Sequence, residues 1–173
     1  MSFKKFLKRT AGLASIAVVA IALFNFLPSI KVVSLIPILG KTEPTNSLSG
    51  RIGSDGPILV VKIDDTPPAH PQAGLEDADV VYIEQVEGGL TRLAAVFSSK
   101  IPTVIGPVRS ARISDIEILQ QYGRVAFAYS GAQSKLLPVI AAANLENLGA
   151  QRQSPEIYAN DPLRIAPTAM MLQ

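Results

Sequence analysis

The sequence contains no cysteine among its 173 residues. This absence excludes disulfide bonds, thiolate metal sites, cysteine nucleophiles and a lipidated N-terminal cysteine. The single histidine, His70, has no cysteine and no second histidine with which to share a zinc ion. We therefore expect no metal site and no cofactor, and we expect a hydrophobic core to stabilise the folded part.

Several catalytic signatures are missing as well. The sequence has no P-loop, no dinucleotide-binding glycine fingerprint and no Gly-x-Ser-x-Gly nucleophile elbow. A serine–histidine pair would have to combine His70 with a serine such as Ser110 or Ser130, and no surrounding motif supports that pairing. The sequence therefore assigns no catalytic residue.

Acidic residues are absent from residues 1–42, whereas residues 1–9 carry four basic side chains. Residues 10–30 carry no charge at all. At about 1.5 Å per helical residue this stretch spans roughly 30 Å, the thickness of the hydrocarbon core of a bilayer. We predict a transmembrane helix over 10–30, with 1–9 as a cytoplasmic basic segment and the rest of the chain outside the cytoplasm.

A cleavable signal peptide is the alternative interpretation of this N-terminus. Its apolar region is normally 7–15 residues long and ends in a small-x-small cleavage site. The apolar run here is longer, and no such site follows it. We favour an uncleaved signal anchor and a single-pass protein of the cell membrane, although both interpretations export the domain.

The total charge of +2 conceals an acidic domain. From residue 41 onward the chain has 11 basic and 14 acidic residues, which gives 11 − 14 = −3. Nucleic-acid-binding domains usually carry a basic surface. We therefore expect no nucleic acid as a partner.

The folded domain is expected over residues 58–173, after a linker over 31–57 whose second half is rich in Gly, Pro, Ser, Thr and Asn. Short runs of β-branched and apolar residues predict five strands. They lie at 58–64, 79–86, 91–98, 103–105 and 124–129. The apolar residues 169–173 suggest a further element that begins where the sequence stops.

Two helices are expected among these strands. Ser114 and Glu117 match a capping box at the start of the first, and Gly123 is a plausible terminator. The second is expected over 132–143, where Pro138 either kinks the helix or marks its first turn. The fold class is therefore α/β or α+β, with two helices packed on a mixed sheet.

Residues 106–112, Gly-Pro-Val-Arg-Ser-Ala-Arg, place Arg109 and Arg112 in the approach to the first helix. A helix N-terminus favours anions, and arginine grips carboxylate or phosphate with two parallel hydrogen bonds. These residues could therefore form an anion site. Alternatively, both arginines pair with acidic residues of the protein and brace the loop.

Carboxylates at two other positions are candidate partners. Glu84 and Glu87 lie beside a predicted turn at Gly88-Gly89, and a salt bridge to Arg92 or Arg109 is a better use of them than glycoside hydrolysis. Asp64 and Asp65 follow the first strand, where carboxylates can bind a metal, transfer protons or cap a turn.

Three stretches of the sequence resemble the N-terminal domain of the YerB-like family of bacterial envelope lipoproteins, whose function is unknown. They are HPQAGLEDADVVYIEQVEGGLTRLAAVF, IGPVRSARISDIEI and FAYSGAQ. The resemblance extends from residue 58 to the C-terminus. It implies a characteristic cluster formed by Arg92, Arg109, Arg112, Glu84, Gly88 and Gly89. Arg164 and Pro167 match a later Arg-x-x-Pro element more weakly.

Two features of that family are missing from this chain. Its members carry a lipidated cysteine, which the predicted transmembrane helix would replace here. They also continue into a second domain, and the resemblance supplies no reaction. The favoured function is a membrane-anchored extracytoplasmic domain that binds an anionic small molecule or a cell-wall component.

In this hypothesis Arg109, Arg112 and Arg92 hold the anion. Glu84 orients the arginines, Gly88 and Gly89 shape the adjoining turn, and Ser110 lies between the two loop arginines. The first alternative is a hydrolase of wall glycan or peptide that uses Glu84, Glu87 or Asp64 as acid or base. The second is a structural interaction module. We favour a binding domain over an enzyme.

Overall fold

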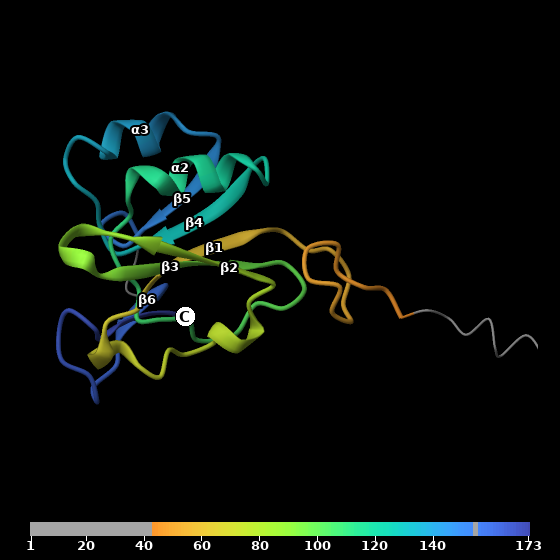
Figure 1. The fold of residues 1–173 in the computed structure, drawn as a ribbon, viewed down its shortest axis with the longest axis horizontal. Coiled ribbons are helices and arrows are strands. Elements are labelled where there is room, and N and C mark those ends of the chain that lie inside the picture. Colours follow the sequence, from red (N-terminus) through yellow and green to blue (C-terminus); the bar gives the residue numbers. More distant parts are fainter. Residues whose placement is uncertain (1–42, 154–155) are drawn as a thin grey trace, which may run out of the picture. The chain divides into compact units, whose positions relative to one another are not determined.

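A five-stranded mixed sheet organises residues 43–153 and 156–173, which are the part of the chain that the computed structural model describes (Figure 1). The strand order is β2-β3-β1-β4-β5. The strands are β1 (Leu59–Asp64), β2 (Val80–Gln85), β3 (Thr91–Phe97), β4 (Val125–Tyr129) and β5 (Leu145–Gly149). The β2, β3 and β1 strands pair antiparallel, whereas β1, β4 and β5 pair in parallel.

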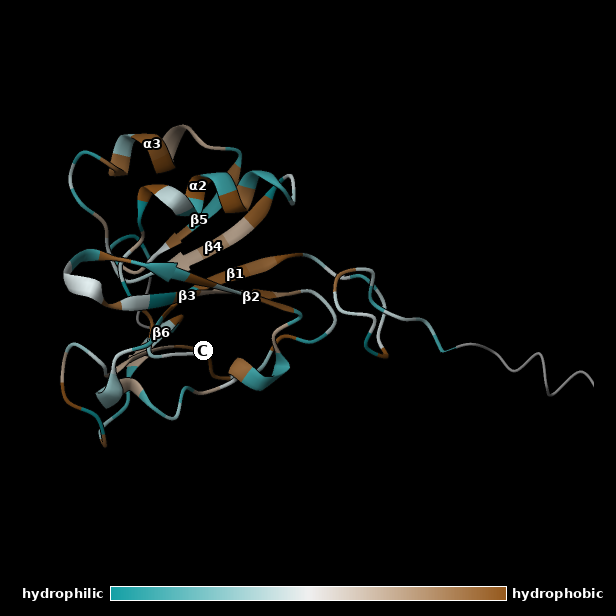
Figure 2. Ribbon diagram, in the orientation of Figure 1, coloured by the Kyte–Doolittle hydropathy of each residue, from teal (hydrophilic) through white to brown (hydrophobic). Residues whose placement is uncertain are grey.

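Strand β1 is buried along its whole length because both faces of the sheet are covered. On one face Val60 packs with residues of α2 (Ile113–Gln120) and α3 (Leu137–Ala142). On the other face Val61 and Ile63 pack against Ile105, Val108 and a small sheet. That sheet is formed by β6 (Tyr158–Asn160) and β7 (Met170–Leu172). Figure 2 shows the apolar character of β1 and β4 between these layers.

The first helix begins differently from the expected capping box. Arg112 is its N-cap residue, and the Arg112 amide donates to Asp115 Oδ2 at 2.6 Å. The prediction that Ser114 and Glu117 form the cap is therefore wrong, because the Ser114 hydroxyl donates to Glu84 instead. In the shorter α3, Pro138 lies in the first turn, as one of the two expectations had it.

Four predicted strands are confirmed, and one is wrong. In the segment 103–105, Ile105 forms only an isolated bridge to Leu172. Strand β5 was not expected. Between β2 and β3, Gly88 and Gly89 both have φ near +73°, which confirms that the turn needs positive φ. Short 3-10 turns lie at Pro67–Ala69, Leu75–Asp77 and Glu87–Gly89.

These elements form an α+β domain with two helices on a mixed sheet. Within residues 43–153 and 156–173, no helix has the length and apolarity needed to cross a membrane. The predicted transmembrane segment 10–30 and the basic segment 1–9 lie outside the described residues.

Residues 43–57, the described part of the predicted linker, contact the end of the sheet. The Asp79 carboxylate accepts hydrogen bonds from Ser49 Oγ and from the amides of Ser98 and Ser99, at 2.6 and 2.7 Å for the two amides. Burial raises the pKa of Asp79, but these hydrogen bonds outweigh burial and lower it to about 2. Gly56 adds a further contact, since its amide donates to Ser98 Oγ at 3.1 Å.

Candidate functional site

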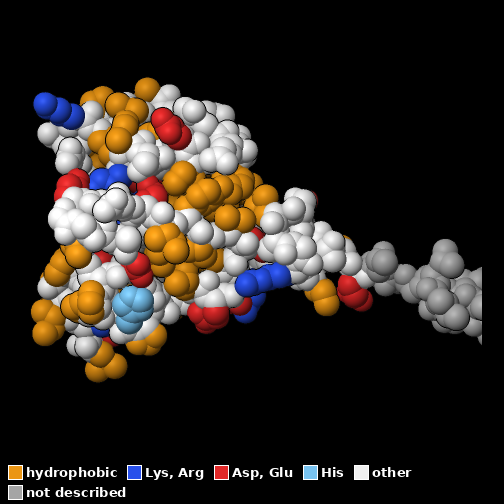
Figure 3. Space-filling view, in the orientation of Figure 1, with side chains coloured by type: hydrophobic (Ala, Val, Ile, Leu, Met, Phe, Trp, Pro, Cys, Tyr) orange, Lys and Arg blue, Asp and Glu red, His pale blue; other side chains and the backbone are white. Residues whose placement is uncertain are grey.

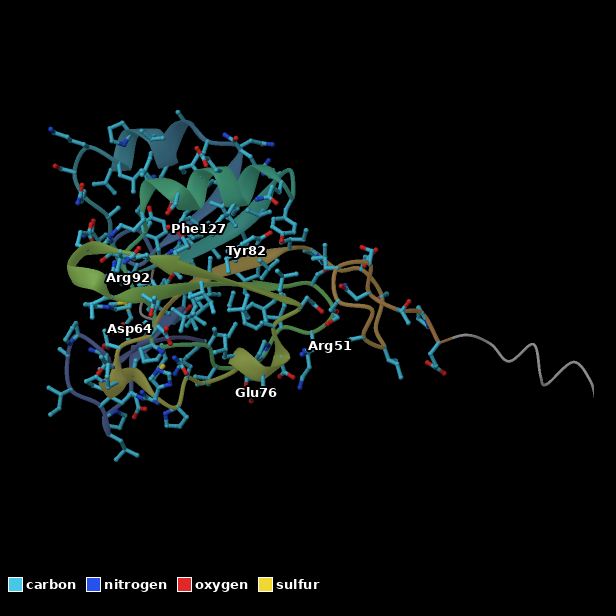
Figure 4. The ribbon with its side chains drawn as sticks, in the orientation of Figure 1. Arg51, Asp64, Glu76, Tyr82, Arg92 and Phe127 are labelled. Atoms are coloured by element: carbon cyan, nitrogen blue, oxygen red, sulfur yellow. The ribbon has the colours of Figure 1, made fainter. Side chains whose placement is uncertain are left out.

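Charged residues of three strands meet at one end of the sheet. Arg92 of β3 lies opposite Asp64 of β1 and opposite Glu84 of β2 in the strand register. Figure 4 shows Asp64 and Arg92 near the same end of the sheet. Because side chains alternate along a strand, Lys62 lies on the same face of β1 as Asp64. This end of the sheet holds two groups of charges with different surroundings.

The first group, which we call the lysine cluster, consists of Lys62, Glu84, Ser114 and Asp115. Lys62 is 0% exposed, and its Nζ pairs with Glu84 and with Asp115 Oδ1, the latter at 2.8 Å. Ser114 Oγ donates to the other Glu84 oxygen. Each charged group therefore has a partner although the cluster is buried.

Burial raises the pKa of Asp115 to about 6, against the opposing effect of Lys62. For Glu84, burial is outweighed by the hydrogen bonds from Lys62 and Ser114, so its pKa is lowered. The expectation that Glu84 orients the arginines is not met, because its carboxylate is occupied by Lys62 and Ser114.

The second group contains the three predicted arginines. The Ser110 carbonyl accepts hydrogen bonds from Nη1 of Arg92 and from Nη1 of Arg112, both at 3.3 Å. Burial lowers the pKa of Arg92, and the neighbouring charges of Arg112 and Arg109 lower it further. The loop 106–112 and strand β3 thus bring the guanidinium groups of Arg92 and Arg112 together at the Ser110 carbonyl, and Arg109 is close enough to affect the pKa of Arg92.

Arg112 is fully engaged with the protein. Its Nε and Nη2 donate to Glu87 Oε2 at 3.0 and 2.7 Å, and its Nη1 donates to the carbonyls of Ser110 and Ala111. The hydrogen bonds from Arg112 lower the pKa of Glu87. Since Glu87 begins the turn that contains Gly88 and Gly89, Arg112 ties this turn to the start of α2. Arg112 therefore has the structural role that the alternative prediction gave it, as a residue that holds the loop in place.

Arg109 is only partly engaged. Its Nε lies 3.1 Å from Asp64 Oδ2, yet both atoms are buried and neither makes a well-formed hydrogen bond. Its terminal Nη atoms have no protein acceptor in the described ranges 43–153 and 156–173. The backbone is fixed on both sides, because the Arg109 amide donates to Lys62 O at 2.8 Å and its carbonyl accepts from Ser130.

Asp64 and Arg109 line a cleft of about 870 Å³. Its walls are two loops that follow β1 and β6, and they contribute Thr66, Pro68, His70, Asp161 and residues 163–168. Figure 3 shows the histidine, in pale blue, among exposed apolar side chains on this part of the surface.

Arg164 fastens the two walls together. Its Nη1 donates to the Ala69 carbonyl at 2.8 Å, its Nη2 donates to the Pro71 carbonyl, and its Nε lies 3.2 Å from Asp161 Oδ2. The weakly matching Arg-x-x-Pro element therefore forms one wall of the cleft. The role of Arg164 was not predicted, because the sequence does not reveal which loops meet.

The structure distributes the predicted site residues over both groups. Arg92 and Arg112 meet at Ser110, Gly88 and Gly89 join them through Glu87, and Arg109 lies near Arg92 but pairs with Asp64. Glu84 belongs to the lysine cluster. Sequence reasoning missed Lys62, although a lone charge in the apolar run of β1 was a usable signal.

The family of this chain follows from its sequence. A family model described as "Protein of unknown function (DUF3048) N-terminal domain" matches residues 45–173. The chain belongs to this family. It is also 48% identical over 56 residues to the Bacillus subtilis (strain 168) protein named "Putative lipoprotein YerB", a match that covers 32% of this chain and 17% of that protein. The resemblance to a YerB-like domain is thereby confirmed.

The fold is shared with a solved structure. The crystal structure of YerB from Bacillus subtilis matches with a TM-score of 0.69 and 22% sequence identity. The match covers 75% of this chain and 46% of the YerB chain. The DUF3048 N-terminal domain described here therefore corresponds to less than half of that relative.

Proposed function

We propose that this DUF3048 domain binds an anionic ligand in the cleft, with Arg109 as the main anion-binding residue. The observation that supports this proposal is the state of its guanidinium group. Arg109 lines the cleft and is 20% exposed, and its Nη atoms have no acceptor among the residues that the structure describes. Arg92, buried behind it, adds positive charge to the site.

The guanidinium group of Arg109 is buried at its Nε, whereas its Nη atoms are not among the buried atoms and reach the solvent of the cleft. Arginine has five N–H donors, and four of them are on the Nη atoms. Asp64 lies beside the Nε of Arg109, which leaves the donors of both Nη atoms for another group. A carboxylate or phosphate would accept two of them in parallel. Arg112, in contrast, has no such need and serves as a brace.

The carboxylates favour binding over hydrolysis. Glu84 is held by Lys62 in the buried cluster, and Glu87 is held by Arg112. The pKa values of both are lowered, whereas a general acid needs a raised one. Of the three carboxylates considered for a hydrolase, Asp64 is the one that lines the cleft. Asp161 also lines the cleft, but its Oδ2 lies 3.2 Å from Arg164 Nε and its Oδ1 accepts from the Leu163 amide. The described residues of the cleft therefore do not offer two free carboxylates, the pair that glycoside hydrolysis requires.

The proposed location is the outer face of the cell membrane. The charge-free segment 10–30 behind a basic N-terminus supports an anchor, and a relative named as a lipoprotein supports an envelope location. Protease added to intact spheroplasts should degrade the domain, and carbonate washing should leave the full chain in the membrane. A protease-protected or carbonate-soluble chain would contradict this location.

Binding can be tested on the full chain in a mild detergent. Thermal unfolding, followed by circular dichroism at 222 nm, is measured with phosphate, simple carboxylates and muropeptides. A ligand at 100 times its Kd should add about 2.7 kcal/mol to the free energy of unfolding, which raises the melting temperature by several degrees.

The Arg109→Gln variant should lose this stabilisation. Arg124→Gln is the matched control, because Arg124 forms an exposed pair with Glu146 and directly precedes β4, at the end of the sheet opposite Asp64. This variant should keep the full shift. The proposal fails if no anion stabilises the native chain, or if Arg109→Gln responds as strongly as the control.

A further inference from the structure

Two large apolar side chains in the lining of the cleft are exposed to solvent. Leu163 is 93% exposed and Ile165 is 86% exposed, and both line the cleft that Arg109 also lines. Pro68 and Pro167 extend this apolar wall. Covering a leucine or isoleucine side chain is strongly favourable, so a ligand that reaches this wall gains affinity from it.

The loop that carries these side chains is held in place. Arg164, between them, is bonded to the opposite wall. The Asp161 amide donates to Ala169 O at 2.7 Å, and the Leu163 amide donates to Asp161 Oδ1 at 2.9 Å. Thr168 Oγ1 donates to the Ile165 carbonyl at 2.8 Å. Because hydrogen bonds hold both ends and the middle of this loop, its conformation keeps Leu163 and Ile165 exposed.

The charges around Arg109 favour a ligand with one negative charge. Two guanidinium groups, those of Arg109 and Arg164, and two carboxylates, those of Asp64 and Asp161, line the cleft. The buried Arg92, which interacts with Arg109 and Asp64, adds a third positive charge. The balance is 3 − 2 = +1. Asp64 is 1% exposed at its side chain, and its Oδ2 has no hydrogen-bond donor. A dianion on Arg109 would bring a second negative charge close to this carboxylate, where water screens the repulsion poorly.

We infer that the ligand is a monocarboxylate that carries an apolar group, as found at the end of a peptide with an apolar last residue. This inference rests on the proposed anion-binding function and adds the class of ligand. The carboxylate accepts from the two Nη atoms of Arg109, and the apolar group covers Leu163 and Ile165. A cleft of about 870 Å³ has room for several residues of such a peptide.

Isothermal titration of the full chain in detergent, with a detergent blank, tests the inference. The probes are N-acetyl-leucyl-leucine, its C-terminal amide, acetate, octanoate and hexyl phosphate. The peptide acid should bind at least tenfold more tightly than its amide, since the amide has no charge for Arg109. It should also bind more tightly than acetate, which cannot reach the apolar wall. If octanoate binds more tightly than the peptide acid, the ligand class holds and its source is a lipid.

A pair of variants separates the two parts of the site. Leu163→Ser with Ile165→Ser should weaken the peptide acid by about tenfold and leave acetate unchanged, and the fold should survive because both side chains are exposed. Asp64→Asn should improve hexyl phosphate more than the peptide acid, because it removes the carboxylate that repels a dianion.

The outcomes distinguish the inference from the function on which it rests. Tighter binding of hexyl phosphate than of either carboxylate to the native chain overturns the ligand class but leaves anion binding intact. Equal affinities for the peptide acid and acetate overturn the role of the apolar wall. Absence of binding by every anion overturns both proposals.

Discussion

Lys62 and Asp64 are two residues apart on β1, both are buried, and both belong to ion pairs, yet their surroundings differ. Lys62 has two carboxylate partners, and Ser114 satisfies one of them further. Asp64 has one guanidinium partner in a poor hydrogen-bonding geometry, at the bottom of an open cleft.

The comparison shows that a charged side chain can be buried with or without a full set of hydrogen-bond partners. Burial by itself does not distinguish a structural charge from a binding charge, because both members of this comparison are buried. The lysine cluster supplies a partner for each of its charged groups and needs no ligand. The Asp64–Arg109 pair is not saturated in this way, and the Nη donors of Arg109 remain open to an anionic ligand in the cleft.

Removal of Lys62 should have the largest effect. Lys62→Met leaves Glu84 and Asp115 buried without their counterion, and breaking a buried pair in this way costs about 3–5 kcal/mol. Urea denaturation of the full chain, followed by circular dichroism, measures the change in the free energy of unfolding. The control combines Lys62→Met with Glu84→Gln and Asp115→Asn, which removes all three charges and should recover at least half of the loss. If Lys62→Met lowers the free energy of unfolding by less than about 1 kcal/mol, the lysine cluster is not the buried, mutually paired group described above.

Asp115 should make the stability depend on pH. Its folded-state pKa, raised by burial to about 6, lies above the ordinary value of 3.8, so its contribution is fully present below about pH 4 and is lost as the pH rises through about 6. Asp115→Asn abolishes this term. The stability of the variant minus that of the native chain should therefore grow by about 1–3 kcal/mol between pH 4 and pH 7. A constant difference in urea titrations across this range would show that Asp115 has an ordinary pKa.

Asp64→Asn should have the smallest effect on stability. The asparagine oxygen can still accept from the Thr66 amide, and Arg109 is partly solvated in the cleft. We expect a loss of about 1 kcal/mol or less. The same urea titration compares it with Lys62→Met. A loss as large as that of Lys62→Met would mean that Asp64 and Arg109 form a structural pair, and the contrast with the lysine cluster would disappear.

Local sequence patterns predicted the elements whose stability is local. The β-branched runs of β1, β2, β3 and β4 each indicate a strand without reference to the rest of the chain. Strand β5, Leu145–Gly149, has the mixed sequence LENLG, and its pairing with β4 comes from tertiary contacts. The false capping box has a similar origin, because Glu84, distant in sequence, attracts the hydroxyl of Ser114.

The site was predictable only in part for the same reason. The spacing of Arg109 and Arg112 drew attention to loop 106–112, and these arginines do lie with Arg92. That spacing does not reveal that the donors of Arg112 are occupied by protein acceptors while the Nη donors of Arg109 face the cleft. That difference depends on Glu87 and on the loop around Arg164, which approach from distant parts of the chain.

The hydrogen bonds of Asp79 also have a mechanical consequence. They fasten the entering segment to the end of the sheet through Ser49, Ser98 and Ser99. A pulling force applied to the chain before residue 43 would act on these hydrogen bonds before it acts on β1. Strand β1 lies at the centre of the sheet and would have to separate from two neighbouring strands at once. In a force-extension experiment, Asp79→Ala should therefore lower the first rupture force and leave the main unfolding force unchanged.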